Sequence, residues 1–212
     1  GREQSRGGLT AEAHRRGHKV TGHLCSVTYR EAAALGIDNL EHGFFVSTDF
    51  VPDKRPDVCP GQGVGIATIA ALDRAAAQLR ALIADLVQHH VALTATLTVF
   101  ETFVPGRPLP PGLDVLDPIL RERFEHLYEA TAHDTGTVMA RAFAVDRAME
   151  VAFFHAGGLL IAGTDPTGGG GVIPGYSNQR ELELLVESGL TPLEAIRVGT
   201  LNGATFLGRA GA

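Results

Sequence analysis

Residues 159–164 read LLIAGT and are followed at once by Asp165. A short aliphatic run bounded by glycine is typical of a buried strand, and Asp165 stands at its carboxyl end. Three further runs have the same character: Lys19–Cys25 (KVTGHLC), Asn39–Phe44 (NLEHGF) and Val91–Thr98 (VALTATLT). Helical patterns lie between and after these runs. This alternation predicts an α/β fold with a parallel sheet and a helix after each strand.

Two helices carry their own start and stop signals. Thr28 and Glu31 have the spacing of a capping box, in which the hydroxyl and the carboxylate each accept from the other residue's amide. That helix is predicted to end at Gly36, since glycine readily takes the left-handed conformation after a helix. Residues 191–194 (TPLE) form a second box, with proline at the first helical position. This last helix is predicted to end at Gly208.

The middle of the chain combines helices with two long connections. Ile66 to about Gln88 reads as one long alanine-rich helix, and Pro118 to about Phe154 as one helix or as two broken near residues 133–136. The connections Phe45–Gly65 and Glu101–Asp117 are rich in proline and glycine, and both follow the carboxyl end of a predicted strand. Long loops in this place usually carry function.

Composition excludes several classes of protein. The chain has 212 residues, a net charge of −6 and only two lysines, with no basic stripe of the kind that nucleic-acid binding needs. Its apolar runs are too short to span a membrane, and from its polar, basic first residues we expect no signal peptide. Cys25 and Cys59 do not form a CxxC pair, so reduced thiols in a cytoplasmic protein are the simpler expectation, and a disulfide stays open.

Three polar residues stand near the carboxyl ends of predicted strands. His23 and His42 lie late in the first and second strands, and Asp165 follows the fourth. Parallel strands bring these ends to one rim, where two imidazoles and a carboxylate suit Zn²⁺ or a similar divalent ion. Such an ion would activate water for attack on a carbonyl. Taken singly, each histidine could equally be a hydrogen-bonded core residue and the aspartate a turn cap.

Four segments carry a resemblance to a known family: TGHLCS (21–26), GIDNLEHGF (36–44), IAGTDP (161–166) and the tail ESGLTPLEAIRVGTLNGATFLG (187–208). In this order they resemble the amidohydrolase superfamily, in its imidazolonepropionase-like and Xaa-Pro dipeptidase-like branch. The resemblance implies a TIM-type (β/α)8 barrel, of which this chain would supply about four βα units, strands five to eight. Residues 1–212 are therefore expected to be a partial barrel domain, truncated at both ends.

The resemblance also implies an activity. His23, His42 and Asp165 match the family's metal ligands on the fifth, sixth and eighth strands, and Asp165 matches the residue that shuttles a proton from water to the leaving amine. We therefore expect hydrolysis of C–N bonds in a small amide or dipeptide, with zinc as the default among one or two divalent ions. Tyr29, Tyr176 and Asn178 lie in loops where family members contact substrate, and are candidate substrate-binding residues.

The chain also departs from the family pattern. It contains no His-x-His pair, which the family carries on its first strand. Lys19 and Lys54 are not placed to bridge two metal ions. The alternative prediction is a catalytically incomplete fragment or an assembly subunit. Since four strands cannot close a barrel, we also expect a homo-oligomer or a missing N-terminal half as partner. The glycine run 168–171 reads as a flexible lid, with a phosphate nest as a weaker alternative.

Overall fold

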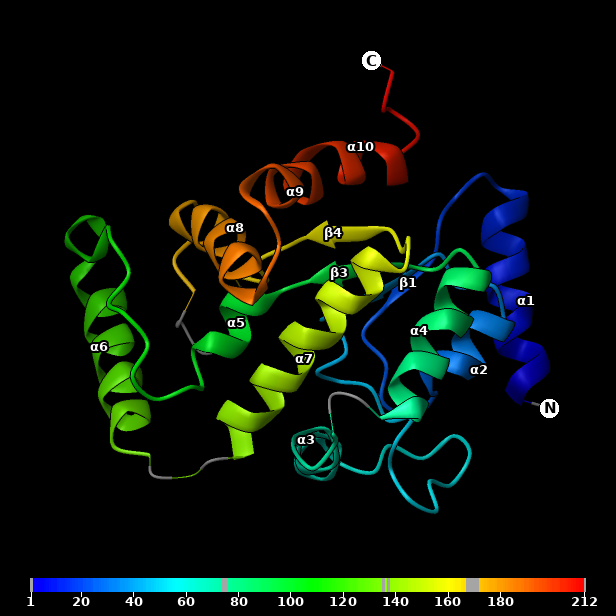
Figure 1. Ribbon diagram of the computed structural model, residues 1–212, viewed down its shortest axis with the longest axis horizontal. Helices are drawn as coiled ribbons and strands as arrows, with labels where there is room; N and C mark the ends of the chain where they lie inside the picture. The colour runs from blue at the N-terminus through cyan, green and yellow to red at the C-terminus, as the bar shows by residue number, and fades with distance from the viewer. Residues whose placement is uncertain (1, 74–75, 135, 137, 167–171, 212) are drawn as a thin grey trace.

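The computed structural model describes residues 2–73, 76–134, 136, 138–166 and 172–211. In this part of the chain, four strands form one parallel sheet in sequence order (Figure 1). The strands are β1 (Thr21–Gly22), β2 (Asn39–Glu41), β3 (Ala92–Ala95) and β4 (Leu160–Ala162). The predicted α/β class is therefore confirmed, with all four strands inside the predicted runs.

The centre of the sheet is a row of paired leucines. Leu40 of β2 is opposite Leu93 of β3, which is opposite Leu160 of β4, and all three are fully buried. Burial of each such side chain contributes roughly 1.5–3 kcal/mol. Polar residues alternate with these leucines: the Asn39 amide donates to the Thr21 and Thr94 hydroxyls, which links the first three strands through their side chains.

Helices surround this sheet and pack on one another as well as on the strands. Contacts join α2 to α4, α4 to α7, α8 to α5 and α9, and the π-helical turn η2 to β4. At the far end from α1, helix α6 stands apart from the sheet (Figure 1). The helices are α1 (Arg2–Arg15), α2 (Tyr29–Ala34), α3 (Gln62–Ala70), α4 (Ala77–Gln88), α5 (Leu97–Glu101), η1 (Leu113–Val115), α6 (Pro118–Ala132), α7 (Val138–His155), α8 (Tyr176–Ser188), α9 (Pro192–Arg197), η2 (Val198–Asn202) and α10 (Gly203–Phe206).

Both predicted capping boxes are confirmed. Thr28 and Glu31 exchange hydrogen bonds at the start of α2, and Thr191 does the same with its third helical residue at the start of α9. Gly36 follows α2 with a φ of 82°, as expected for a left-handed helix end. The final helical segment reaches the predicted length but contains the π-helical turn η2. Within that turn, the buried Asn202 donates to the Leu160 carbonyl at 2.7 Å and so ties the segment to β4.

Two predictions about elements in the middle of the chain were wrong. The single long helix is two helices, α3 and α4. The first packs on α7, and the second packs on both α7 and α2. The third strand ends at Ala95 rather than Thr98, because α5 begins at Leu97. The amides of Leu97 and Thr98 donate to the buried Glu181 carboxylate at 3.1 and 2.9 Å, which stabilises that helix start. The alternative of a break between α6 and α7 is confirmed.

The cysteines also differ from expectation, since Cys25 and Cys59 form a disulfide with their Cα atoms 4.9 Å apart. The loop after β2 folds back over the loop after β1, which brings together two thiols that lie 34 residues apart. The expectation of reduced thiols is corrected, and with it the thiol-based argument for a cytoplasmic location. None of the helices in the described residues is long and apolar enough to cross a bilayer.

Candidate metal centre

The turn after β2 carries His42 in an uncommon backbone conformation. His42 has a φ of 71° and Gly43 a φ of 57°, both in the left-handed region. The Gly43 amide donates to the Thr94 carbonyl at 2.9 Å, and the Tyr29 hydroxyl donates to the Gly43 carbonyl at 2.7 Å. A non-glycine residue persists in this region only where surrounding contacts hold it, as is common at functional sites.

The His42 ring is held from one side and faces a carboxylate on the other. Its Nδ1 lies 2.9 Å from the Thr96 hydroxyl, and its Nε2 lies 3.8 Å from Oδ2 of Asp165. Burial lowers the pKa of His42, and the neighbouring His23 lowers it further. Both effects favour the neutral imidazole, which is the form that binds metal ions.

In the structure, His42 lies next to each of the other two predicted ligands, His23 and Asp165. The His23 and His42 rings meet edge to face with their centroids 4.6 Å apart. Asp165, which follows β4, also has a left-handed backbone, with a φ of 42°. His42 therefore lies between His23 and Asp165 at the carboxyl ends of β1, β2 and β4.

The donor types suit a single zinc-like ion, since two imidazoles and a carboxylate form a common three-ligand set. Within the described residues, however, no group of three or more His, Cys, Asp or Glu side chains is arranged to hold an ion. His42 contacts both partners, but the three side chains do not converge on one point.

Sequence reasoning missed three buried carboxyl groups behind the site. Asp146 and Glu150 of α7 and Glu181 of α8 are each at most 1% exposed. Burial raises the pKa of Asp146 to about 8, that of Glu181 to about 7, and that of Glu150 well above its usual range. The available sequence signal was a pair of acidic residues, Asp146 and Glu150, four positions apart among apolar residues that are buried.

These carboxyl groups hold the backbone on which the site is built. Asp146 Oδ1 accepts from the Phe44 amide at 2.7 Å, two residues after His42. Glu181 accepts from the first two amides of α5, directly after Thr96. A Cβ atom at Gly43 would overlap the Glu150 carboxyl group and lie 2.9 Å from Asp146 Oδ1. Glycine is therefore required where the His42 turn meets this pair.

The three candidate substrate-binding residues lie in three different surroundings. Tyr29 is fully buried and supports the His42 turn through its hydroxyl, which leaves it no surface for a substrate contact. Tyr176 lines a separate hollow of about 160 Å³ beside Arg180. Asn178 lines a hollow of about 300 Å³ that includes Thr164, the neighbour of Asp165. The glycine run 168–171 lies outside the described residues.

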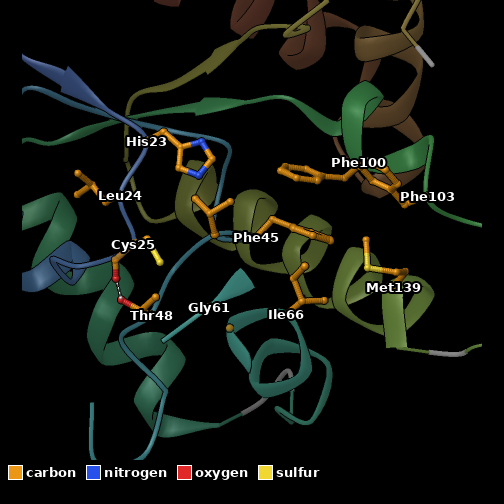
Figure 2. A pocket seen from close by; sticks show the side chains of 12 residues that line it. His23, Leu24, Cys25, Phe45, Thr48, Gly61, Ile66, Phe100, Phe103 and Met139 are labelled. Atoms are coloured by element: carbon orange, nitrogen blue, oxygen red, sulfur yellow. Dashed lines mark hydrogen bonds between the residues drawn. The ribbon is translucent and has the colours of Figure 1, made fainter. Parts of the chain in front are cut away.

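A third hollow lies directly beside His23. This cavity has a volume of about 290 Å³, and Figure 2 shows Phe45, Phe100, Ile66 and Met139 around it with His23 at one side. Phe45 and Phe100 stack with their ring centroids 3.9 Å apart, and the Phe100 ring lies 5.8 Å from that of His42. An apolar cavity therefore adjoins the paired histidines.

Comparison with known proteins identifies the fold of this chain. No protein-family model matches the chain, and no curated protein sequence matches it. Among solved structures, an amidohydrolase matches with a TM-score of 0.56 and 17% identity over 98% of this chain and 37% of its own. Bottromycin amidohydrolase matches with a TM-score of 0.59 and 20% identity over 95% of this chain and 43% of its own. An uncharacterized protein matches with a TM-score of 0.55 and 16% identity over 99% of this chain and 38% of its own.

The chain thus spans about two fifths of the length of these solved chains. Its four parallel strands, with helices between them, correspond to that part of the matched structures. Identities of 16–20% establish the fold alone. The chain has the fold of part of an amidohydrolase (β/α) barrel, as the sequence resemblance predicted.

Proposed function

We propose that this chain supplies a metal-binding and proton-transferring part of a hydrolase that cleaves C–N bonds in small amides or dipeptides. One observation carries the proposal: His42, in a strained backbone conformation, lies between His23 and Asp165 where parallel strands end. Barrel enzymes build their active sites at this end of the strands. The amidohydrolase names of two structural neighbours support the same activity.

Each residue has a defined part in this proposal. His23, His42 and Asp165 would hold a divalent ion, for which zinc is our first choice. Such an ion, when bound, polarises a carbonyl and lowers the pKa of water. Thr96 lies against Nδ1 of His42 and so leaves Nε2 available on the Asp165 side. The Asp165 carboxylate accepts the proton of the attacking water and returns it to the leaving amine.

The first test is bound metal per chain, measured by mass spectrometry on the purified 212-residue protein. We expect about one zinc-like ion in the parent and none in a His23→Ala/His42→Ala double variant. A His18→Ala/His126→Ala double variant is the matched control, because both histidines are exposed, His18 in the loop before β1 and His126 on α6. Equal metal content in all three proteins, or none in the parent, would contradict the proposed site.

The second test separates metal binding from chemistry. Asp165→Asn keeps the shape and a metal-binding oxygen but removes the proton acceptor. We expect its hydrolysis of a panel of N-acyl amino acids and dipeptides to fall by at least about 100-fold, within the usual range for acid–base catalysis. Metal content should fall less than in the histidine variant. Metal binding without hydrolysis by the parent would instead favour the catalytically incomplete chain.

A further inference from the structure

The cavity beside His23 has a rigid apolar base. Phe45 is 1% exposed and Phe100 is 9% exposed, and their rings are stacked with an interplanar angle of 13°. Phe45 comes three residues after His42, and Phe100 also contacts the His42 ring. The base of the cavity is therefore fixed directly to the residues of the candidate metal centre.

The outer part of the cavity is more exposed and comes from other elements. Phe103, just after α5, is 46% exposed, and Met139 lies in the first turn of α7. Ile66 and Gly65 of α3 also line the cavity. Methionine adapts its shape to different apolar partners, so this side can accommodate ligands of somewhat different size.

The chemistry of the walls restricts what can enter. Among the lining residues that the structure describes, there is no carboxylate, ammonium or guanidinium group, and His23 is the single titratable side chain. A charged group buried here would lack an ionic partner, which is strongly unfavourable. The volume of about 290 Å³ lies just below the range for whole drug-sized ligands. It suits one side chain of a ligand.

We propose that this cavity is a specificity pocket that binds an uncharged aliphatic or aromatic side chain of the substrate, next to the amide bond that is cleaved. This inference rests on the proposed hydrolase function and names its substrate class. The substrate amide lies toward His23 and His42, while its side chain packs between Ile66 and the stacked phenylalanines. The pocket therefore selects N-acyl or dipeptide substrates whose reacting residue is leucine-like or phenylalanine-like.

The chain offers a matched pair of glycines for testing this. Gly65 is buried and lines the cavity, and a Cβ atom there would meet one atom within 4 Å, the Ser47 carbonyl oxygen at 3.9 Å. Gly63 is on the same helix but exposed, with nothing within 4 Å of its Cβ position. Gly65→Leu adds a large side chain at the cavity wall, Gly65→Ala adds a small one, and Gly63→Leu adds the same large side chain at an exposed position of the helix.

The measurement is calorimetric binding of N-acetyl-L-phenylalaninamide and N-acetylglycinamide to each protein. We expect the parent and Gly63→Leu to bind the phenylalanine probe at least about tenfold more tightly, as one apolar group in a fitted pocket provides. Gly65→Leu should lose this preference and Gly65→Ala should reduce it, with melting curves confirming that both fold. Equal binding of the two probes by the parent, or an unchanged preference in folded Gly65→Leu, would overturn the proposal.

Hydrolysis assays with the same two residue types distinguish this inference from the function on which it rests. Side-chain preference in binding without hydrolysis would support the pocket and contradict the hydrolase. Hydrolysis of both amides without preference would support the hydrolase and contradict the pocket.

Discussion

The two neighbouring histidines of the candidate centre are held in different ways. The His42 turn is fixed from the core side by buried groups: Asp146 on the Phe44 amide, Tyr29 on the Gly43 carbonyl and Thr96 on the ring. His23 is exposed and follows a strand of two residues.

The segment after His23 is fixed from outside by the loop that follows β2. Cys25 is joined to Cys59, and the Thr48 hydroxyl donates to the Cys25 carbonyl at 3.2 Å. The Lys54 ammonium donates to the Ser26 carbonyl at 2.7 Å. The comparison indicates a rigid half-site at His42 and a tethered half-site at His23.

The largest effect is expected from Gly43→Ala. The added methyl group would overlap the Glu150 carboxyl group in the core, and alanine would have to adopt a φ of 57°. We expect unfolding free energy to fall by roughly 4 kcal/mol, with about 3 from the clash and about 1 from the left-handed backbone. Urea denaturation measures this loss.

Gly61→Ala is its control on the tethered side. Gly61 also has a positive φ, 88°, but nothing lies within 4 Å of its Cβ position. Its conformation (φ 88°, ψ 142°) is one that residues other than glycine rarely adopt, so Gly61→Ala should lose on the order of 1–3 kcal/mol, from the backbone alone. Equal losses in the two variants would mean that the His42 turn is no more rigidly packed than the loop.

The next effect is expected from removing the disulfide with Cys25→Ser/Cys59→Ser. A cross-link over this length of chain contributes about 3 kcal/mol, mainly by restricting the unfolded state. We also expect faster hydrogen exchange in residues 46–61, with the Phe44 amide still protected by Asp146. Because these are the chain's two cysteines, reduction of the parent should reproduce the result. Loss of protection at Phe44 would show that the two half-sites are not independently held.

A smaller effect concerns pH and the buried carboxyl pair. Burial raises the pKa of Asp146 to about 8, so the folded protein retains a proton that the unfolded chain releases at lower pH. This contribution favours folding at acid pH and is lost as pH rises from about 4 to 8. Asp146→Asn, which keeps an acceptor for the Phe44 amide, should weaken this dependence and raise stability at pH 8 by on the order of 1–2 kcal/mol.

Thermal unfolding between pH 5 and 8 measures that slope. Asp117→Asn is the control, since Asp117 is an exposed helix cap and asparagine caps equally well. An Asp146→Asn protein with the parent's full slope would show that Asp146 is not the group that titrates.

The sequence predicted which side chains meet at the ends of the strands, but it did not predict which buried side chains support them. His23, His42 and Asp165 were predicted to meet because parallel strands share one edge, and the structure places them as neighbours. The roles of Asp146 and Tyr29 depend on which helix face packs inward. A helix that begins just after a strand can turn its first residue either way, so Tyr29 was predicted to contact substrate rather than to support the His42 turn from the core.

The disulfide shows the same limit for a loop. Its formation depends on how residues 45–61 fold back over the segment after β1. That path is set by contacts such as Thr48 with Cys25 and Lys54 with Ser26, which link positions more than 20 residues apart. The spacing of the cysteines and the local sequence pattern do not encode this path of the loop.

The smallest expected effect on stability compares two buried threonines, each 3% exposed. Thr96→Val removes the hydroxyl at Nδ1 of His42, and Thr48→Val removes the hydroxyl on the Cys25 carbonyl. Each should lower unfolding free energy by about 1 kcal/mol, the usual contribution of one hydrogen bond.

Their effects on zinc affinity should differ, because the group that fixes the second nitrogen of a metal-binding histidine typically contributes 10–100-fold in metal affinity. We expect about tenfold weaker zinc binding in Thr96→Val and an unchanged dissociation constant in Thr48→Val, measured by competition with a chromogenic chelator. Thr96→Ser, which keeps the hydroxyl, should restore binding. If Thr96→Val and Thr48→Val weaken zinc binding equally, the hydroxyl at Nδ1 does not orient His42, and the rigid half-site depends on the backbone of the turn alone.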